Sequence, residues 1–305
     1  MRIQSVLAVV AAFPSLANAA DSVHLAPSSP WVVDYAENSC RLARRFGTGK
    51  ELTTLAFESE APGSLDMLVI GRPLGTFDES ATAGFLPLQS KPFTGTVART
   101  TDRGIPSILF NRIGFLPDGI AAAEKQSEAD RRAHPEVRPP AESLATQAAR
   151  IARRQTFAAR VTGLEVDARP NHPVILDTGS LGEAIKALDE CSRDSLRDWG
   201  VDPDVEDKIV RPVWAPNPSG WFSPLDYPRD MLAQRRESVV KVRALVDATG
   251  KVTKCTTVSH FKEPEFDRIT CERFTAKAHF EPAELADGTK VASYYVNKVV
   301  FRIAK

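Results

Sequence analysis

The chain has 305 residues, of which 43% are hydrophobic and 26% are charged. This composition is typical of a globular protein, and the length allows two domains with their own cores, so a disordered or fibrous chain is excluded. Because 39 basic and 39 acidic residues cancel, the chain has no net positive field that would attract nucleic acid.

The first twenty residues have the pattern of a secretory signal peptide. Arg2 supplies the positive charge, residues 6–13 form an apolar run, and Ala17-Asn18-Ala19 fits the small-x-small cleavage pattern. The apolar run is well short of the roughly 20 residues that a membrane-spanning helix needs. The sequence therefore predicts a cleaved signal peptide at 1–20 and an exported protein, with a retained membrane anchor as the alternative.

The next 180 residues or so, 21–200, are predicted to form a strand-rich α+β domain of unknown role. Runs of strand-forming residues bounded by Gly, Pro and Ser predict β-strands at 31–33, 40–46, 52–58, 65–70, 93–99, 107–110 and 160–166. Residues 120–159 are rich in helix formers and predict two helices broken by prolines. A further helix is predicted over 180–200, where apolar residues fall near one stripe and Gly200 can end the helix.

Residues 201–226 are predicted to be a linker. The stretch 201–228 holds six prolines, which exclude a regular helix. It also contains Trp214 and Trp221, which is more aromatic than a fully flexible spacer. We therefore expect part of this segment to pack on a domain surface.

The sequence predicts no catalytic residues, no cofactor and no metal site. Its five histidines stand far apart, without the spacing of metal ligands. Asp202, Asp204 and Glu206 alternate like the start of a calcium loop, but Asp207 stands where such a loop requires glycine. The chain is therefore not expected to be an enzyme; an exported enzyme with a site in the 21–200 domain is the alternative.

The C-terminal region, 227–305, predicts a small β-β-α-β unit. A β-branched run at 239–246 is followed by the turn Asp247-Ala248-Thr249-Gly250 and a second strand at 252–259. A helix is predicted over 265–279, because Cys271, Phe274 and Ala278 are spaced by three and four. A final strand is predicted over 290–303.

The four cysteines of an exported chain are expected to form disulfides. Cys40, Cys191, Cys255 and Cys271 allow three pairings, with free buried thiols as a further alternative. We favour Cys40–Cys191 with Cys255–Cys271, because the second pair lies within one compact unit, where a cysteine of the helix can reach one of the second strand. A closed loop of about 16 residues contributes about 3 kcal/mol on the chain-entropy estimate.

The C-terminal unit resembles the C-terminal domain of the TonB family. The motifs that carry the resemblance occur in the family's order: Tyr227-Pro228, Asp247-Ala248-Thr249-Gly250, Val258-Ser259, Phe266-Asp267, Phe280-Glu281-Pro282-Ala283 and Gly288. The segments Cys40-Arg41-Leu42-Ala43 and 198–202, together with the cysteine pair, are similar to a periplasmic branch of TonB-like proteins. The resemblance implies a periplasmic protein linked to energy-dependent transport across the outer membrane.

The resemblance also implies a protein partner. Family members bind an extended segment of a TonB-dependent outer-membrane receptor by adding it as a strand to a sheet edge. The expected edge is 294–301, and the residues proposed to bind the partner are Tyr227, Tyr294, Tyr295, Asn297, Lys298, Val299 and Phe301. The alternatives are ordinary pairing within the fold, and a homodimer or homo-oligomeric scaffold formed through the same edge. TonB energy transducers have an uncleaved membrane helix and a long Pro-rich spacer, and neither is evident here.

Overall fold

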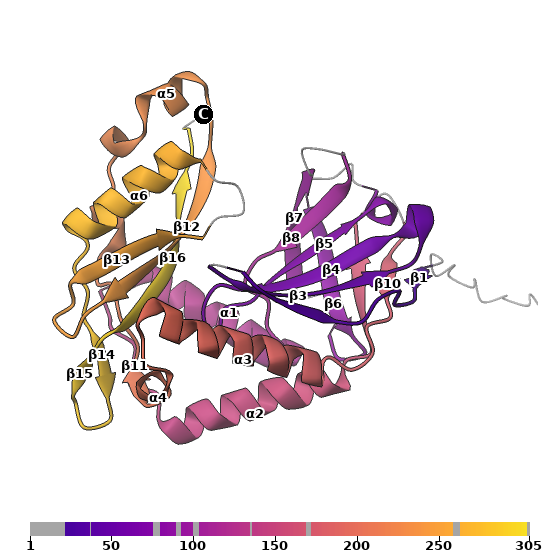
Figure 1. Cartoon of the computed structure of the whole chain (residues 1–305), viewed down its shortest axis with the longest axis horizontal. Helices are drawn as coiled ribbons and strands as arrows, with labels where there is room; N and C mark the ends of the chain where they lie inside the picture. Colours follow the sequence, from indigo (N-terminus) through magenta and orange to yellow (C-terminus); the bar gives the residue numbers. More distant parts are fainter. Residues whose placement is uncertain are drawn as a thin grey trace, which may run out of the picture.

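The computed structural model describes residues 22–303 except 37, 76–79, 90–92, 100–103, 135, 169–171 and 259–262. The predicted signal peptide lies outside the described residues. Figure 1 shows an N-terminal unit and a C-terminal unit, with long helices of the N-terminal unit running below both. The mixture of helix and sheet confirms the predicted α+β class.

The N-terminal unit is built on one large, mostly antiparallel sheet. Its strands run in the order β1-β10-β9-β6-β7-β8-β5-β4-β3-β2. Their bounds are β1 Val23–Leu25, β2 Val32–Tyr35, β3 Cys40–Phe46, β4 Thr53–Ser59, β5 Asp66–Gly71, β6 Ser80–Leu86, β7 Phe93–Arg99, β8 Pro106–Phe110, β9 Gly163–Asp167 and β10 Val174–Leu176. Short 3-10 turns follow β3 (η1, Gly49–Glu51) and β5 (η2, Arg72–Leu74).

The two edges of this sheet meet at one segment of chain. β1 pairs with β10, and just after β1 the carbonyl of Ala26 accepts a 2.8 Å hydrogen bond from the N–H of Gly47, next to the end of β3. The sheet therefore closes on itself around an aromatic core. In that core the rings of Phe85 and Phe115 stack at 4.7 Å, and Phe57 lies 5.9 Å from Phe115.

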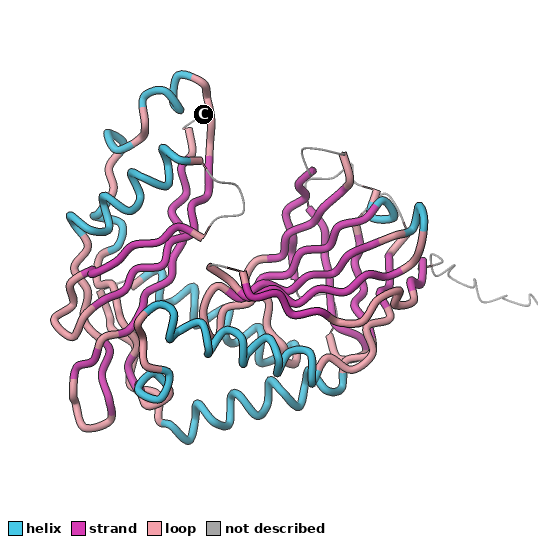
Figure 2. Tube along the Cα trace, viewed as in Figure 1, coloured by secondary structure: helices cyan, strands magenta, loops and turns pink. Residues whose placement is uncertain are grey.

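Three long helices complete the N-terminal unit: α1 Asp118–Ala133, α2 Leu144–Arg160 and α3 Gly182–Trp199. The two helices expected within 120–159 and the one over 180–200 are therefore confirmed. α3 buries Ile185, Leu188 and Cys191, and it ends at Gly200, whose φ of 84° favours glycine. Figure 2 shows α2 and α3 side by side along the lower side of the molecule.

The segment 201–226 packs on both units: its first residues contact α3, and most of the rest packs against the C-terminal unit. It contains α4 Pro203–Glu206, β11 Ile209–Arg211, η3 Pro218–Trp221 and η4 Pro224–Asp226. β11 pairs with β14 (Ala283–Leu285), which pairs with β15 (Lys290–Val291). The indole of Trp221 lies 5.0 Å from the ring of Phe280 and 5.3 Å from that of Phe274. These contacts agree with the expectation that part of this stretch packs on a domain.

The C-terminal unit has a three-stranded sheet covered on one face by a helix. Its elements are α5 Arg229–Ala233, β12 Ser238–Val246, β13 Val252–Thr257, α6 Pro264–Lys277 and β16 Ser293–Phe301, and the strand order is β13-β12-β16. The single strand expected over 290–303 is instead two, because β15 pairs with β14 in a separate sheet. The turn between β12 and β13 is as predicted: Gly250 has a φ of 87°, and the carboxylate of Asp247 accepts hydrogen bonds from the N–H groups of Thr249 and Lys251.

Both predicted disulfides are present. Cys40 on β3 is joined to Cys191 on α3, with 6.0 Å between their Cα atoms. Cys255 on β13 is joined to Cys271 on α6, with 5.5 Å between their Cα atoms. One bond therefore fixes α3 to the large sheet, and the other fixes α6 to the small one.

Candidate functional site: the outer edge of β16

The strand β16 forms one edge of the C-terminal sheet. Among the described strands it pairs with β12 alone, in an antiparallel ladder from Ser238↔Phe301 to Val246↔Ser293. In such a ladder the N–H and C=O of alternate residues face the neighbouring strand, and those of the residues between them face away from it. Every second residue of β16 therefore presents its backbone donor and acceptor to the outside of the sheet.

Two hydrogen bonds show which residues face outward. The backbone carbonyl of Lys241 accepts a 2.9 Å hydrogen bond from the N–H of Val258, on the β13 side of β12. The backbone groups of Lys241 therefore point away from β16, and they form no hydrogen bonds with Lys298, the residue opposite. The N–H of Lys298 instead donates to Oδ1 of Asn297 at 2.8 Å. Alternation then assigns the outward backbone groups to Tyr294, Val296, Lys298 and Val300.

The side chain of Asn297 occupies part of this edge. Its Oδ1 accepts from the outward N–H of Lys298, and its Nδ2 donates to the hydroxyl oxygen of Tyr295 at 2.8 Å. Burial raises the pKa of Tyr295, so this hydroxyl is protonated at neutral pH. Asn297 thus satisfies the donor that an added strand would use, which is one way in which sheet edges are protected.

A pocket of about 240 Å³ lies beside this edge, on the α6 side of the sheet. Its aromatic wall comes from η3, the residue after it and α6, and its strand side comes from β16. The lining residues are Pro218, Ser219, Trp221, Phe222, Phe274, Asn297, Lys298 and Val299. Because Trp221 is held edge-to-face against Phe274 and Phe280, the wall is preformed.

The opposite face of the sheet is covered by the N-terminal unit. There the ring of Tyr294 packs edge-to-face on Trp199 at 5.7 Å, and the guanidinium of Arg243 lies 3.5 Å from the centre of the same indole. Burial lowers the pKa of Arg243 to about 10, so the side chain keeps its charge at neutral pH.

An ion cluster lies in the same contact. The ammonium of Lys241 on β12 contacts both Glu60 and Asp66 of the N-terminal unit, and only 9–12% of each side chain is exposed. Burial alone would lower the pKa of Lys241, but the attraction of the two carboxylates outweighs it and raises that pKa. Burial raises the pKa of Glu60 against the attraction of Lys241. A buried cluster of this kind is costly to break from one side.

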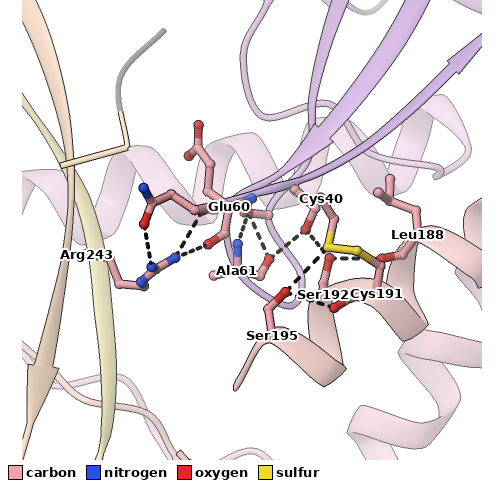
Figure 3. The surroundings of a disulfide bond; sticks show 11 residues. Cys40, Glu60, Ala61, Leu188, Cys191, Ser192, Ser195 and Arg243 are labelled. Atoms are coloured by element: carbon pink, nitrogen blue, oxygen red, sulfur yellow. Dashed lines mark hydrogen bonds between the residues drawn. A yellow bond between two sulfur atoms is a disulfide. The ribbon is translucent and has the colours of Figure 1, made fainter. Parts of the chain in front are cut away.

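The contact also reaches the first disulfide. Arg243 donates to the carbonyls of Asn38 and Glu60, at 3.1 and 3.3 Å. Figure 3 shows Arg243 pointing at the turn that carries Glu60 and Ala61, with the Cys40–Cys191 bond on the other side of that turn. The turn that receives the C-terminal unit is therefore braced by the covalent link between β3 and α3.

The residues predicted to bind a partner fall into three places. Tyr227 and Phe301 pack together in the core, their rings 5.8 Å apart. Tyr294 lies in the contact between the two units. Asn297, Lys298 and Val299 line the pocket beside the outer edge, and the hydroxyl of Tyr295 accepts a hydrogen bond from Asn297 there.

Sequence reasoning missed the aromatic wall of the pocket. Trp221 and Phe222 lie in the segment predicted to be a linker, and the helical spacing of Phe274 predicts only that it faces the sheet. The only signal in the sequence was the aromatic content of the Pro-rich stretch. The part of the chain that the structure describes contains no group of three or more His, Cys, Asp or Glu side chains placed to hold a metal ion. Within the same residues, every helix is too short or too polar to cross a membrane.

Comparison with known proteins agrees with the fold of the C-terminal unit. Residues 223–303 match the family described as Gram-negative bacterial TonB protein C-terminal. The C-terminal unit is therefore a TonB C-terminal domain, from a family associated with energy-coupled transport and without enzymatic activity. No curated protein matches the chain.

Proposed function

We propose that this chain is a periplasmic TonB-like protein, exported through a cleaved signal peptide, that binds extended segments of TonB-dependent outer-membrane receptors. The segment adds as a fourth strand along the outer edge of β16. The observation that carries the proposal is the row of outward backbone groups at Val296, Lys298 and Val300, next to a preformed pocket. The match of residues 223–303 to the TonB C-terminal family supports it.

Main-chain hydrogen bonds supply much of the affinity in this mode of binding. Each contributes about 1 kcal/mol net, because the peptide exchanges bonds to water for bonds to the protein. At Lys298 the peptide carbonyl replaces Oδ1 of Asn297, so the amide side chain turns away from the edge when the strand is added.

The N-terminal unit confines binding to the edge. The contacts of Trp199, Glu60 and Asp66 occupy the sheet face opposite α6. A partner that approaches the C-terminal sheet therefore meets the outer edge of β16 and the α6 side.

The experiment compares Lys298→Pro with Lys298→Ala in the full disulfide-bonded protein. Both variants lack the lysine side chain, but only proline lacks the outward N–H, and a strand tolerates proline where its N–H faces away from the ladder. Peptides from the N-terminal segments of TonB-dependent receptors are titrated by calorimetry. The loss of one backbone bond lowers the affinity of the proline variant about fivefold relative to the alanine variant.

The controls separate folding from binding. Thermal melting shows first that both variants keep the fold. A folded proline variant that binds as tightly as the alanine variant removes this edge from the mechanism. If the wild-type protein binds no receptor peptide and sediments as a dimer that Lys298→Pro dissociates, the edge serves self-association instead.

A further inference from the structure

The pocket beside β16 lies where an added strand would place its side chains. Side chains of β16 alternate between the two faces of the sheet, and Asn297 and Val299 lie on the α6 side, where they line the pocket. A neighbouring strand lies about 4.8 Å away and alternates in the same way. Every second side chain of an added strand therefore projects to the α6 side, and those that face Asn297 and Val299 are the ones placed to enter the pocket.

The chemistry of the pocket is apolar inside and polar at the rim. The indole of Trp221 and the rings of Phe222 and Phe274 form its wall, whereas the exposed residues Ser219 and Lys298 stand nearer the solvent. At about 240 Å³ it is smaller than the roughly 300–1,000 Å³ of drug-sized ligand sites. It suits one branched aliphatic side chain and offers no buried cation for an acidic one.

The wall keeps its shape without a ligand. Trp221 also contacts the ring of Tyr295 at 6.4 Å, and Phe222 packs edge-to-face on Phe301 at 6.4 Å. These contacts fix Trp221, at the end of η3, and Phe222, just after it, on the α6 side of the sheet. A side chain that enters the pocket therefore buries apolar surface without a cost of ordering the wall.

We infer that this pocket is the specificity site of the edge: it selects extended peptides that place a branched aliphatic side chain, such as leucine, isoleucine or valine, on the α6 side, opposite Asn297 or Val299. This inference rests on the proposed function, because the peptide backbone must first pair with β16. It adds a side-chain requirement to a mode of binding that otherwise reads only the main chain.

The test uses one receptor peptide that binds the wild-type protein, with each of its positions replaced in turn by alanine. The expected profile alternates with a period of two and has one dominant position, an aliphatic residue whose replacement lowers affinity about tenfold. Ser219 is exposed at the rim, so Ser219→Trp places a ring over the pocket without disturbing the core. In this variant the parent peptide binds with the same affinity as the alanine peptide, that is, the peptide whose dominant aliphatic residue is replaced by alanine.

Two controls make the outcomes distinguishable. Ser219→Ala leaves the pocket open and keeps the tenfold difference, and Ser219→Leu fills it less and gives an intermediate one. Lys298→Pro weakens the parent and the alanine peptide alike, because it acts on the backbone. A tenfold difference that persists in Ser219→Trp, or a profile without a dominant aliphatic position, overturns the pocket inference and leaves strand addition standing. A wild-type protein that binds no receptor peptide overturns the proposed function, and the inference with it.

Discussion

Replacing Lys241 by methionine should weaken the contact between the two units by about 3 kcal/mol. The change leaves the carboxylates of Glu60 and Asp66 buried without their shared cation. Removal of one partner from a buried ion pair typically costs about 3–5 kcal/mol. The lower end applies because Asp66 still accepts a 2.7 Å hydrogen bond from the backbone N–H of Arg112.

Hydrogen exchange with mass spectrometry localises this effect. The loss should appear as faster exchange in residues 59–66 and in β12, while the buried strands around Phe85 and Phe115 keep their protection. A difference of 3 kcal/mol corresponds to roughly a 150-fold change in the local opening constant. Urea unfolding of the same variant gives the accompanying loss in total stability.

The matched control is Lys254→Met, which removes an exposed lysine from the neighbouring strand β13. Adding Glu60→Gln to Lys241→Met should recover part of the loss, since one uncompensated charge is removed. If Lys241→Met is no more harmful than Lys254→Met, the ion cluster does not hold the units together and the reasoning from burial is refuted.

Three further predictions concern the covalent links, the pH dependence and one turn. Replacing both Cys40 and Cys191 by serine opens a loop with a separation of 151 residues and should lower the free energy of unfolding in urea by about 5 kcal/mol. The same change at the second disulfide, whose separation is 16, should lower it by about 3 kcal/mol. Equal losses would contradict the loop-entropy account. Burial raises the pKa of Glu60 above 4.5, so the folded state binds this proton more tightly than the unfolded state does. The contribution of Glu60 to stability is therefore greatest at low pH and declines as pH rises from 4.5 to the raised pKa. Glu60→Gln should remove this slope from a pH series of melting temperatures. Gly250→Ala should lower the free energy of unfolding by more than about 2 kcal/mol, since a Cβ there would lie 2.0 Å from the carbonyl oxygen of Phe280. Gly288→Ala measures the backbone strain alone, because Gly288 has a similar φ but open space around it. Equal losses in the two variants would show that the clash is relieved.

Local patterns predicted the elements of the C-terminal unit. The spacing of Cys271 and Phe274 identified the face of α6 that meets the sheet, and this placed Cys271 within reach of Cys255. The turn sequence ending in Gly250 identified the hairpin, because its left-handed φ and the side-chain bonds of Asp247 are properties of those residues themselves.

Contacts between distant segments were outside the reach of such patterns. Lys241 and Arg243 alternate with apolar residues on β12, which is the pattern of a solvent-facing side, yet both are covered by the N-terminal unit. Likewise, only the register of β16 against β12 shows that the outward backbone N–H near the centre of the edge belongs to Lys298. The backbone N–H of Asn297 faces β12. A test that removes the backbone N–H of Asn297 would therefore damage the ladder between β12 and β16.

The pairing of β12 with β16 has a mechanical consequence. The two strands are paired at nine consecutive positions, so a pull along the axis of β16 loads the whole ladder in shear rather than opening it one pair at a time. From β12 the load passes sideways through Lys241 and Arg243 into the turn braced by the Cys40–Cys191 bond. Tension applied at the outer edge thus reaches the N-terminal unit through side chains across the sheet, and the chain segment that joins the two units need not bear it.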